Sequence, residues 1–169
     1  MLVSTPLFSA AWIVEGGDSI AGTSPSQGHA SFAAAGVFWE KSFSRRVSAR
    51  VEVFPAALFR ERERPVRFGD SRRVNVAASA ACVLGRYVIA NSASPVFIEA
   101  GAGPFYAYGR PVPSGGTRAN FFDQIGVAWK LARWEIHARY THVSNFGFQG
   151  RNLNPGVSFF SAAIGYSLP

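Results

Sequence analysis

The sequence predicts a single all-β domain over residues 1–169, an eight-stranded antiparallel transmembrane β-barrel. Apolar and polar side chains alternate with a period of two along most of the chain, as they do in strands with two different faces. No apolar run approaches the roughly 20 residues that a transmembrane helix needs. Long and short connecting segments also alternate, which is typical of outer-membrane barrels with long external loops and short periplasmic turns.

The first four strands are expected from this pattern in chain order. Residues 6–14 and 31–40 are apolar stretches. In residues 46–54, valine and alanine at odd positions alternate with serine, arginine and glutamate. In residues 74–84, apolar side chains occupy every even position. We expect the apolar faces to contact lipid and the polar faces to line the lumen.

The last four strands follow the same rule. Residues 96–108 alternate apolar side chains with Glu99 and two glycines, and residues 123–131 place isoleucine, valine, tryptophan and leucine on one face. Residues 134–142 set tryptophan, isoleucine, alanine and tyrosine against glutamate, histidine and arginine. Residues 157–168 are again apolar. This gives eight strands, an even number. The lumen of a barrel of this size is small enough to be filled by side chains.

The segments between these strands differ in length in a regular way. A two-residue turn, Ala132-Arg133, is expected between the sixth and seventh strands. The long segments are about 15–30, 60–73, 109–119 and 145–156, and the other short ones are 41–46 and 85–95. We therefore expect the long segments at one rim of the barrel and both termini at the other.

The polar face favours a membrane barrel over the alternative, a soluble β-domain. Its members lie among small residues, which suits a narrow polar lumen better than a solvated surface. The charged residues and histidine on this face are Arg50, Glu52, Glu99, Lys130, Glu135, His137 and Arg139. The first residues, "MLVSTPLFSAAWIV", lack the basic segment and cleavage site of a signal peptide. We expect that an export signal has been removed or that Met1 lies inside the original gene.

The net charge of +7 indicates an anionic partner, either a phosphate-bearing membrane surface or nucleic acid. Six arginines in residues 60–73 form the main basic cluster. No nucleic-acid partner is expected, because the chain lacks a nucleic-acid-binding motif and aromatic residues interleaved with that cluster.

The single cysteine, Cys82, excludes an intrachain disulfide and a multi-cysteine metal site.

A histidine and a serine stand two residues apart near the end of the seventh strand. The apolar face of residues 134–142 continues through Tyr140 to His142 and Ser144, so both side chains should point outward at the external end. A base and a hydroxyl at that position can meet a lipid of the outer leaflet. The alternative interpretation is that polar residues begin there because the bilayer ends.

At these residues the chain resembles the outer-membrane lipid A 3-O-deacylases, the PagL family. The resemblance covers most of the chain. The matching stretches are "GVFWEKSFSR", "FIEAGAG", "FFDQIGVAWKL", "YTHVSNFG", and "NPG" followed by a last strand ending in "GYSLP". It implies an eight-stranded barrel in the bacterial outer membrane, with a lipid-facing His-x-Ser-Asn site that acts on lipopolysaccharide.

The resemblance also implies residue roles. Ser144 would be the nucleophile that attacks an acyl ester of lipid A, and His142 would be the base that takes its proton. The Asn145 side chain and the Gly147 backbone N–H would form the oxyanion hole. The products would be a free 3-hydroxy fatty acid and lipid A lacking one primary acyl chain. No metal or other cofactor enters this mechanism.

The chain departs from the family at one position. The family has a glutamate near the start of the last strand, where this chain has Ser158, and no carboxylate occurs in residues 136–169. A hydroxyl brings no negative charge to stabilise the imidazolium, so weaker catalysis is expected. A catalytically inactive barrel of structural or lipid-binding function is therefore the alternative.

Two further sets of residues are candidates for the site. If Ala132-Arg133 is a two-residue turn, Asp123 lies directly opposite His142, within reach of the imidazole. We therefore expect Asp123 either to replace the missing carboxylate or to mark the aqueous end of its strand. Arg62, Arg64 and Arg67 would lie in an external loop and could bind the phosphates of lipid A, or they could form a solvated loop.

Overall fold

The computed structural model describes residues 9–20, 29–62, 73–91, 93–112, 116–145 and 156–168. These residues form eight strands and no helix. The strands are β1 (Ser9–Ser19), β2 (Ala30–Ser42), β3 (Val47–Arg62), β4 (Arg73–Ala90), β5 (Val96–Ala107), β6 (Ala119–Leu131), β7 (Trp134–Ser144) and β8 (Val157–Ser167). None of the described residues forms a helix long and apolar enough to cross a bilayer.

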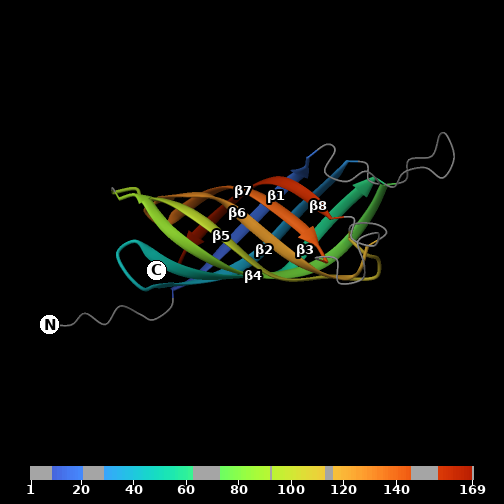
Figure 1. The fold of residues 1–169 in the computed structure, drawn as a ribbon, viewed down its shortest axis with the longest axis horizontal. Coiled ribbons are helices and arrows are strands. Elements are labelled where there is room, and N and C mark those ends of the chain that lie inside the picture. Colours follow the sequence, from blue (N-terminus) through green and yellow to red (C-terminus); the bar gives the residue numbers. More distant parts are fainter. Residues whose placement is uncertain are drawn as a thin grey trace.

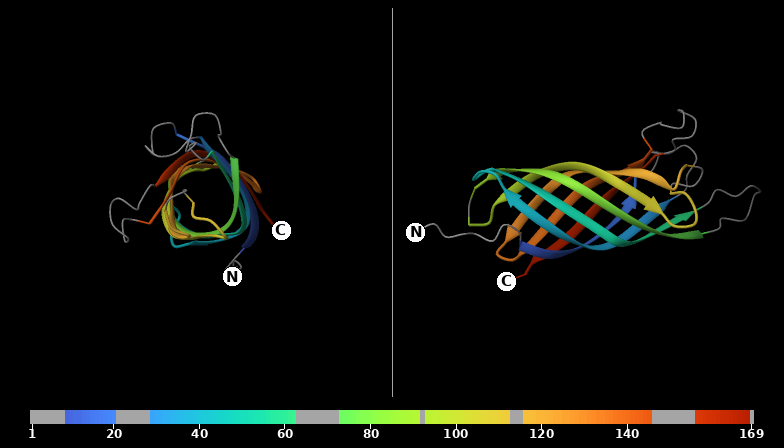
Figure 2. Two further views of the ribbon diagram at one scale, coloured as in Figure 1. Left: turned by 90° about the vertical axis from the view of Figure 1, so that its right-hand side faces the viewer. Right: turned by 90° about the horizontal axis from the view of Figure 1, so that it is seen from below.

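The strands close into an antiparallel barrel in which each one pairs with its neighbours in the sequence (Figure 1). Closure is made by β1 and β8, which pair from Ala11↔Ser167 to Ser19↔Phe159. Viewed along the barrel axis, the strands form a complete ring (Figure 2). The predicted fold class is therefore confirmed.

The two rims of the barrel differ (Figures 1 and 2). The start of β1 and the end of β8 lie at one rim, called here the terminal rim. The ends of β1, β3, β5 and β7 lie at the opposite rim, from which the longer connections leave. This arrangement agrees with the predicted alternation of short and long segments.

Three strands extend furthest beyond the bounds that the sequence pattern predicts. β1 continues to Ser19 instead of ending at residue 14, because Glu15 points into the lumen and the backbone still pairs on both sides. β3 continues to Arg62. β4 continues to Ala90, so residues 85–90, expected in a loop, belong to the ladder with Arg86 paired to Ser48 and Glu99.

The outer surface carries an apolar belt, as expected for a barrel that faces lipid. Large apolar side chains are exposed on every strand; examples are Val14, Val37, Val51, Leu58, Val83, Ile98, Ile125, Val127, Ile136, Phe160 and Ile164. At the terminal rim Trp12, Trp134 and Tyr166 pack together, with ring centroids 4.8–5.9 Å apart. Aromatic clusters near the rim of a membrane barrel are typical of the membrane interface.

A buried ionic network fills part of the lumen. Arg139 donates hydrogen bonds to Glu99 at 2.6 Å, to Glu52 at 2.8 Å and to Glu15 at 2.9 Å. Arg50 and Arg86 bind Glu40 and Glu135 in the same way. Six of the seven residues expected on the polar face are buried here, and Lys130 is half-buried near the terminal rim.

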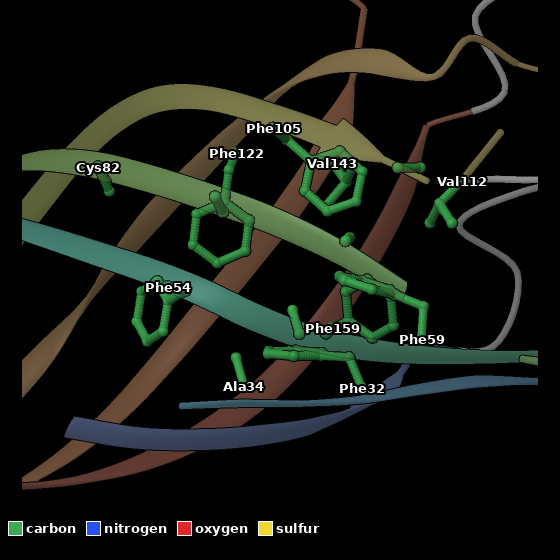
Figure 3. Packing of buried hydrophobic residues seen from close by; sticks show 14 of the residues in the cluster. Phe32, Ala34, Phe54, Phe59, Cys82, Phe105, Val112, Phe122, Val143 and Phe159 are labelled. Carbon is green, nitrogen blue, oxygen red and sulfur yellow. The ribbon is translucent and has the colours of Figure 1, made fainter. Parts of the chain in front are cut away.

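The other part of the lumen is apolar, which corrects the expectation of a polar lumen (Figure 3). Phe59 stacks on Phe32 at 5.4 Å and meets Phe105 and Phe159 edge-on. The apolar face of β4, expected to contact lipid, points inward with this cluster: Val76, Ala78, Ala80, Cys82 and Leu84 are buried. The reason is that the opposite face of β4 consists of small and apolar residues too, so alternation did not distinguish the two faces.

We predict that Arg139→Met lowers the free energy of unfolding by about 3–5 kcal/mol, because it removes the buried cation that Glu15, Glu52 and Glu99 share. Urea-dependent unfolding of the refolded protein in detergent measures this change. Arg45→Met, which removes an exposed arginine between β2 and β3, is the control. Equal unfolding midpoints for the two variants would contradict the assignment of the network as a stabilising unit.

Candidate functional site at the end of strand β7

The β6–β7 hairpin sets the first half of the site. Its two-residue turn, Ala132-Arg133, has Ala132 at φ 54°, and Leu131 pairs with Trp134 as predicted. Two-residue hairpins favour turns with positive φ because their twist matches that of the strands. The register continues without a bulge to Asp123↔His142 and Phe121↔Ser144. The predicted juxtaposition of Asp123 and His142 is therefore present.

His142 and Ser144 lie on the outward face of β7, at its C-terminal end. That end of β7 is at the rim opposite the termini (Figure 1). Their neighbours Thr141 and Val143 point inward and are fully buried. His142 is half-buried, while Ser144 is 4% exposed and Asn145 is 5% exposed. The hydroxyl thus occupies a covered position at the rim, not the open lipid-facing surface that alternation alone suggests.

Strand β8 supplies the second half of the site. His142 pairs directly with Ser158, and the imidazole Nδ1 lies 2.9 Å from the Ser158 hydroxyl oxygen. The Ser158 oxygen is also 2.6 Å from the Tyr140 hydroxyl. Ser158 therefore holds the ring by Nδ1 and leaves Nε2 for another partner.

Gly156 borders both His142 and Ser144. A Cβ atom at this position would lie 2.9 Å from His142 Nε2 and 3.2 Å from Ser144 Cβ. The Nε2 edge of the ring and the Ser144 side chain therefore face the same small space. The Ser144 hydroxyl and His142 Nε2 do not hydrogen bond directly in the structure. Hydrogen bonds between catalytic groups often become short only when substrate binds.

Asp123 does not take the position that Ser158 holds. Its carboxylate makes no hydrogen bond to the described imidazole, and its Oδ1 is buried without a hydrogen-bond partner. Asp123 thus lies opposite His142 in the strand pair without a direct hydrogen bond to it, and Ser158 makes the direct contact.

Several residues predicted for the site are not among those that the structure brings into it. Gly147, Arg64 and Arg67 lie outside the described residues, and Arg62 is described only as the last backbone position of β3. Asn145 directly follows β7 beside Ser144. Sequence reasoning did not assign a role to Tyr140 or Gly156, although Tyr140 shares a face with His142, which was a usable signal.

The family model described as lipid A 3-O-deacylase (PagL) matches residues 15–167. The chain belongs to this family. No curated protein matches the sequence. Among solved structures, the chain is similar to that described as "Crystal structure of the outer membrane enzyme PagL", with a TM-score of 0.68 and 20% identity over 95% of this chain and 100% of that one. The PagL fold is thus shared despite the low identity.

We predict that Gly156→Ala abolishes most turnover of lipid A while the barrel still folds. The added methyl group would displace the imidazole edge from Ser144, and a misplacement of about 1 Å can lower the rate by 10²-fold. Mass spectrometry of lipid A measures turnover, and a gel shift on heating reports folding.

The matched control for this substitution is Gly85→Ala, where the nearest atom to a new Cβ is 3.8 Å away. This variant should retain wild-type turnover. If Gly156→Ala also retained it, the close approach of Gly156 to His142 would have no bearing on the reaction.

Proposed function

We propose that this protein is a serine esterase that hydrolyses the 3-position acyl ester of lipid A in the outer leaflet of the bacterial outer membrane. The observation that carries the proposal is the outward-facing pair at the rim, with His142 held by Nδ1 and its Nε2 edge beside Ser144. Membership of the lipid A 3-O-deacylase family supports the choice of substrate.

The first step follows from this geometry. Ser144 Oγ attacks the ester carbonyl while His142 Nε2 accepts the serine proton, so the Ser144–acyl bond forms and the bond to the sugar oxygen breaks. The same imidazolium then protonates the departing sugar hydroxyl. The Asn145 side chain and the Gly147 N–H stabilise the oxyanion, and one such donor contributes about 2.7–4 kcal/mol in comparable enzymes.

The second step releases the fatty acid. Water attacks the acyl-serine ester while His142 Nε2 accepts a proton from the water, and Ser144 regains its hydrogen as the 3-hydroxy fatty acid leaves. Both steps need the imidazole to carry its proton on Nδ1 and present a lone pair at Nε2. The 2.9 Å contact between Nδ1 and the Ser158 oxygen provides that orientation when Nδ1–H is the donor.

The same network explains why catalysis should be slow. Ser158 contacts Nδ1 but brings no negative charge to the imidazolium that forms during both steps. Asp123 provides charge from the neighbouring strand without a direct hydrogen bond.

For substrate binding, we propose that Arg62, Arg64 and Arg67 bind the phosphates of the lipid A headgroup.

A second candidate function is a catalytically inactive PagL-like barrel with a structural or lipid-binding role. The observation that favours it is the hydroxyl of Ser158 at the position where the family has a carboxylate. The two candidates differ in whether lipid A loses an acyl chain.

We predict that the refolded protein removes one 3-hydroxyacyl group from lipid A in detergent and that Ser144→Ala lowers the rate at least about a thousandfold. Mass spectrometry of the lipid product measures the loss. Ser42→Ala, in the β2–β3 hairpin at the terminal rim, is the control. Unchanged lipid A with a folded wild-type barrel would refute the esterase and leave the inactive barrel.

We also predict that Ser158→Ala lowers kcat about tenfold, because it removes the direct hydrogen bond to Nδ1. Asp123→Asn should lower kcat only about threefold, because its carboxylate faces the imidazole across the strand pair without a hydrogen bond to it. Steady-state kinetics on lipid A separates the two. A larger loss for Asp123→Asn would make Asp123 the group that orients the imidazole.

A further inference from the structure

Tyr140 makes a contact that the reaction described above does not use. Its hydroxyl lies 2.6 Å from the Ser158 oxygen, and that same oxygen lies 2.9 Å from His142 Nδ1. The three groups form a continuous chain of hydrogen bonds across β7 and β8. Ser158, at its centre, is 2% exposed, so water has little access to replace either contact.

The strand register places the tyrosine for this contact. Tyr140 pairs with Phe160, and His142 pairs with Ser158, so Tyr140 reaches Ser158 along the diagonal of the β7–β8 ladder. Long side chains can span this distance. The Tyr140 ring packs edge-on against Phe160 with centroids 6.3 Å apart, which holds the hydroxyl toward Ser158.

The Ser158 hydroxyl, unlike a carboxylate, has a hydrogen that can point in either of two directions. If the Ser158 hydrogen points to Nδ1, the neutral imidazole must carry its own proton on Nε2 and cannot accept the proton of Ser144. If that hydrogen points to the Tyr140 oxygen, Ser158 accepts from Nδ1–H and Nε2 is free. A carboxylate would not face this choice, because it has no hydrogen.

We propose that Tyr140 is a positioning residue that selects the reactive tautomer of His142 by accepting the hydrogen of Ser158. The inference rests on the proposed function. It assigns to this chain a hydrogen-bond relay, Tyr140–Ser158–His142, in which two neutral hydroxyl groups do the orienting work of one carboxylate.

The relay predicts how substitutions of Tyr140 and Ser158 change the kinetics. Tyr140→Phe keeps the ring and its packing on Phe160 but removes the acceptor, so the Ser158 hydrogen turns to Nδ1. We expect kcat to fall about tenfold with KM unchanged. In a Ser158→Glu background the carboxylate accepts from Nδ1–H without help, so the same substitution should change kcat less than about twofold. Tyr106→Phe, which alters an exposed tyrosine on β5, should match the wild type.

The test combines kinetics on lipid A with nitrogen NMR of ¹⁵N-histidine-labelled protein, refolded in detergent at a pH where the ring is neutral. In the wild type and in Tyr106→Phe, Nδ1 of His142 should carry the proton; in Tyr140→Phe the proton should move to Nε2. A His142→Asn sample assigns the signals. A merely structural role of the tyrosine would not change the tautomer.

The outcomes separate this inference from the proposed function. With an active wild type, unchanged kcat in Tyr140→Phe, or an equal loss in the Ser158→Glu background, overturns the relay. With an inactive wild type the esterase fails, and the NMR result alone decides. A shift of the proton to Nε2 in Tyr140→Phe supports the relay, and an unchanged tautomer overturns it.

Discussion

Closure of the barrel by β1 and β8 is the constraint on which the rest of the structure depends. In a bilayer no water is available to satisfy the backbone, so each N–H and C=O must find a partner on a neighbouring strand. The pairing of β8 with β1 on one side fixes its pairing with β7 on the other. That second ladder sets Ser158 opposite His142. The candidate site is therefore a consequence of closure and needs no separate scaffold.

Hydrogen bonds between lumen side chains hold strand β7 in place behind the site. Thr141, next to His142 on β7, points inward and bonds Ser161 of β8 at 3.0 Å and Glu15 of β1 at 3.2 Å. Gln124 of β6 reaches the same hydroxyl at 3.3 Å. Four strands are thus joined behind the outward-facing imidazole. At the end of the barrel near the site, the phenylalanine cluster packs inside the lumen, so the backbone beneath the site lies against buried apolar side chains.

The exchange of a carboxylate for a hydroxyl changes what the site must control. A carboxylate beside Nδ1 fixes the tautomer and stabilises the imidazolium by charge. The Ser158 hydroxyl provides only a dipole, whose direction depends on where its hydrogen points. In surroundings of low dielectric a dipole with fixed direction is worth more than in water. In the proposed reaction, the Tyr140 contact would orient the imidazole and the charge of Asp123 would stabilise the imidazolium, two roles that a carboxylate can combine.

The sequence by itself determined the strands, most of their faces and the β6–β7 register. Period-two alternation depends only on local geometry, and the two-residue turn at Ala132-Arg133 leaves one way to pair Asp123 with His142. The tertiary structure alone decided which group holds Nδ1, because the long segment between β7 and β8 imposes no register and closure supplies it. It also decided the inward face of β4, where both faces are apolar or small. Local patterns thus fix neighbours joined by short turns, whereas contacts between strands joined by long segments depend on the completed barrel.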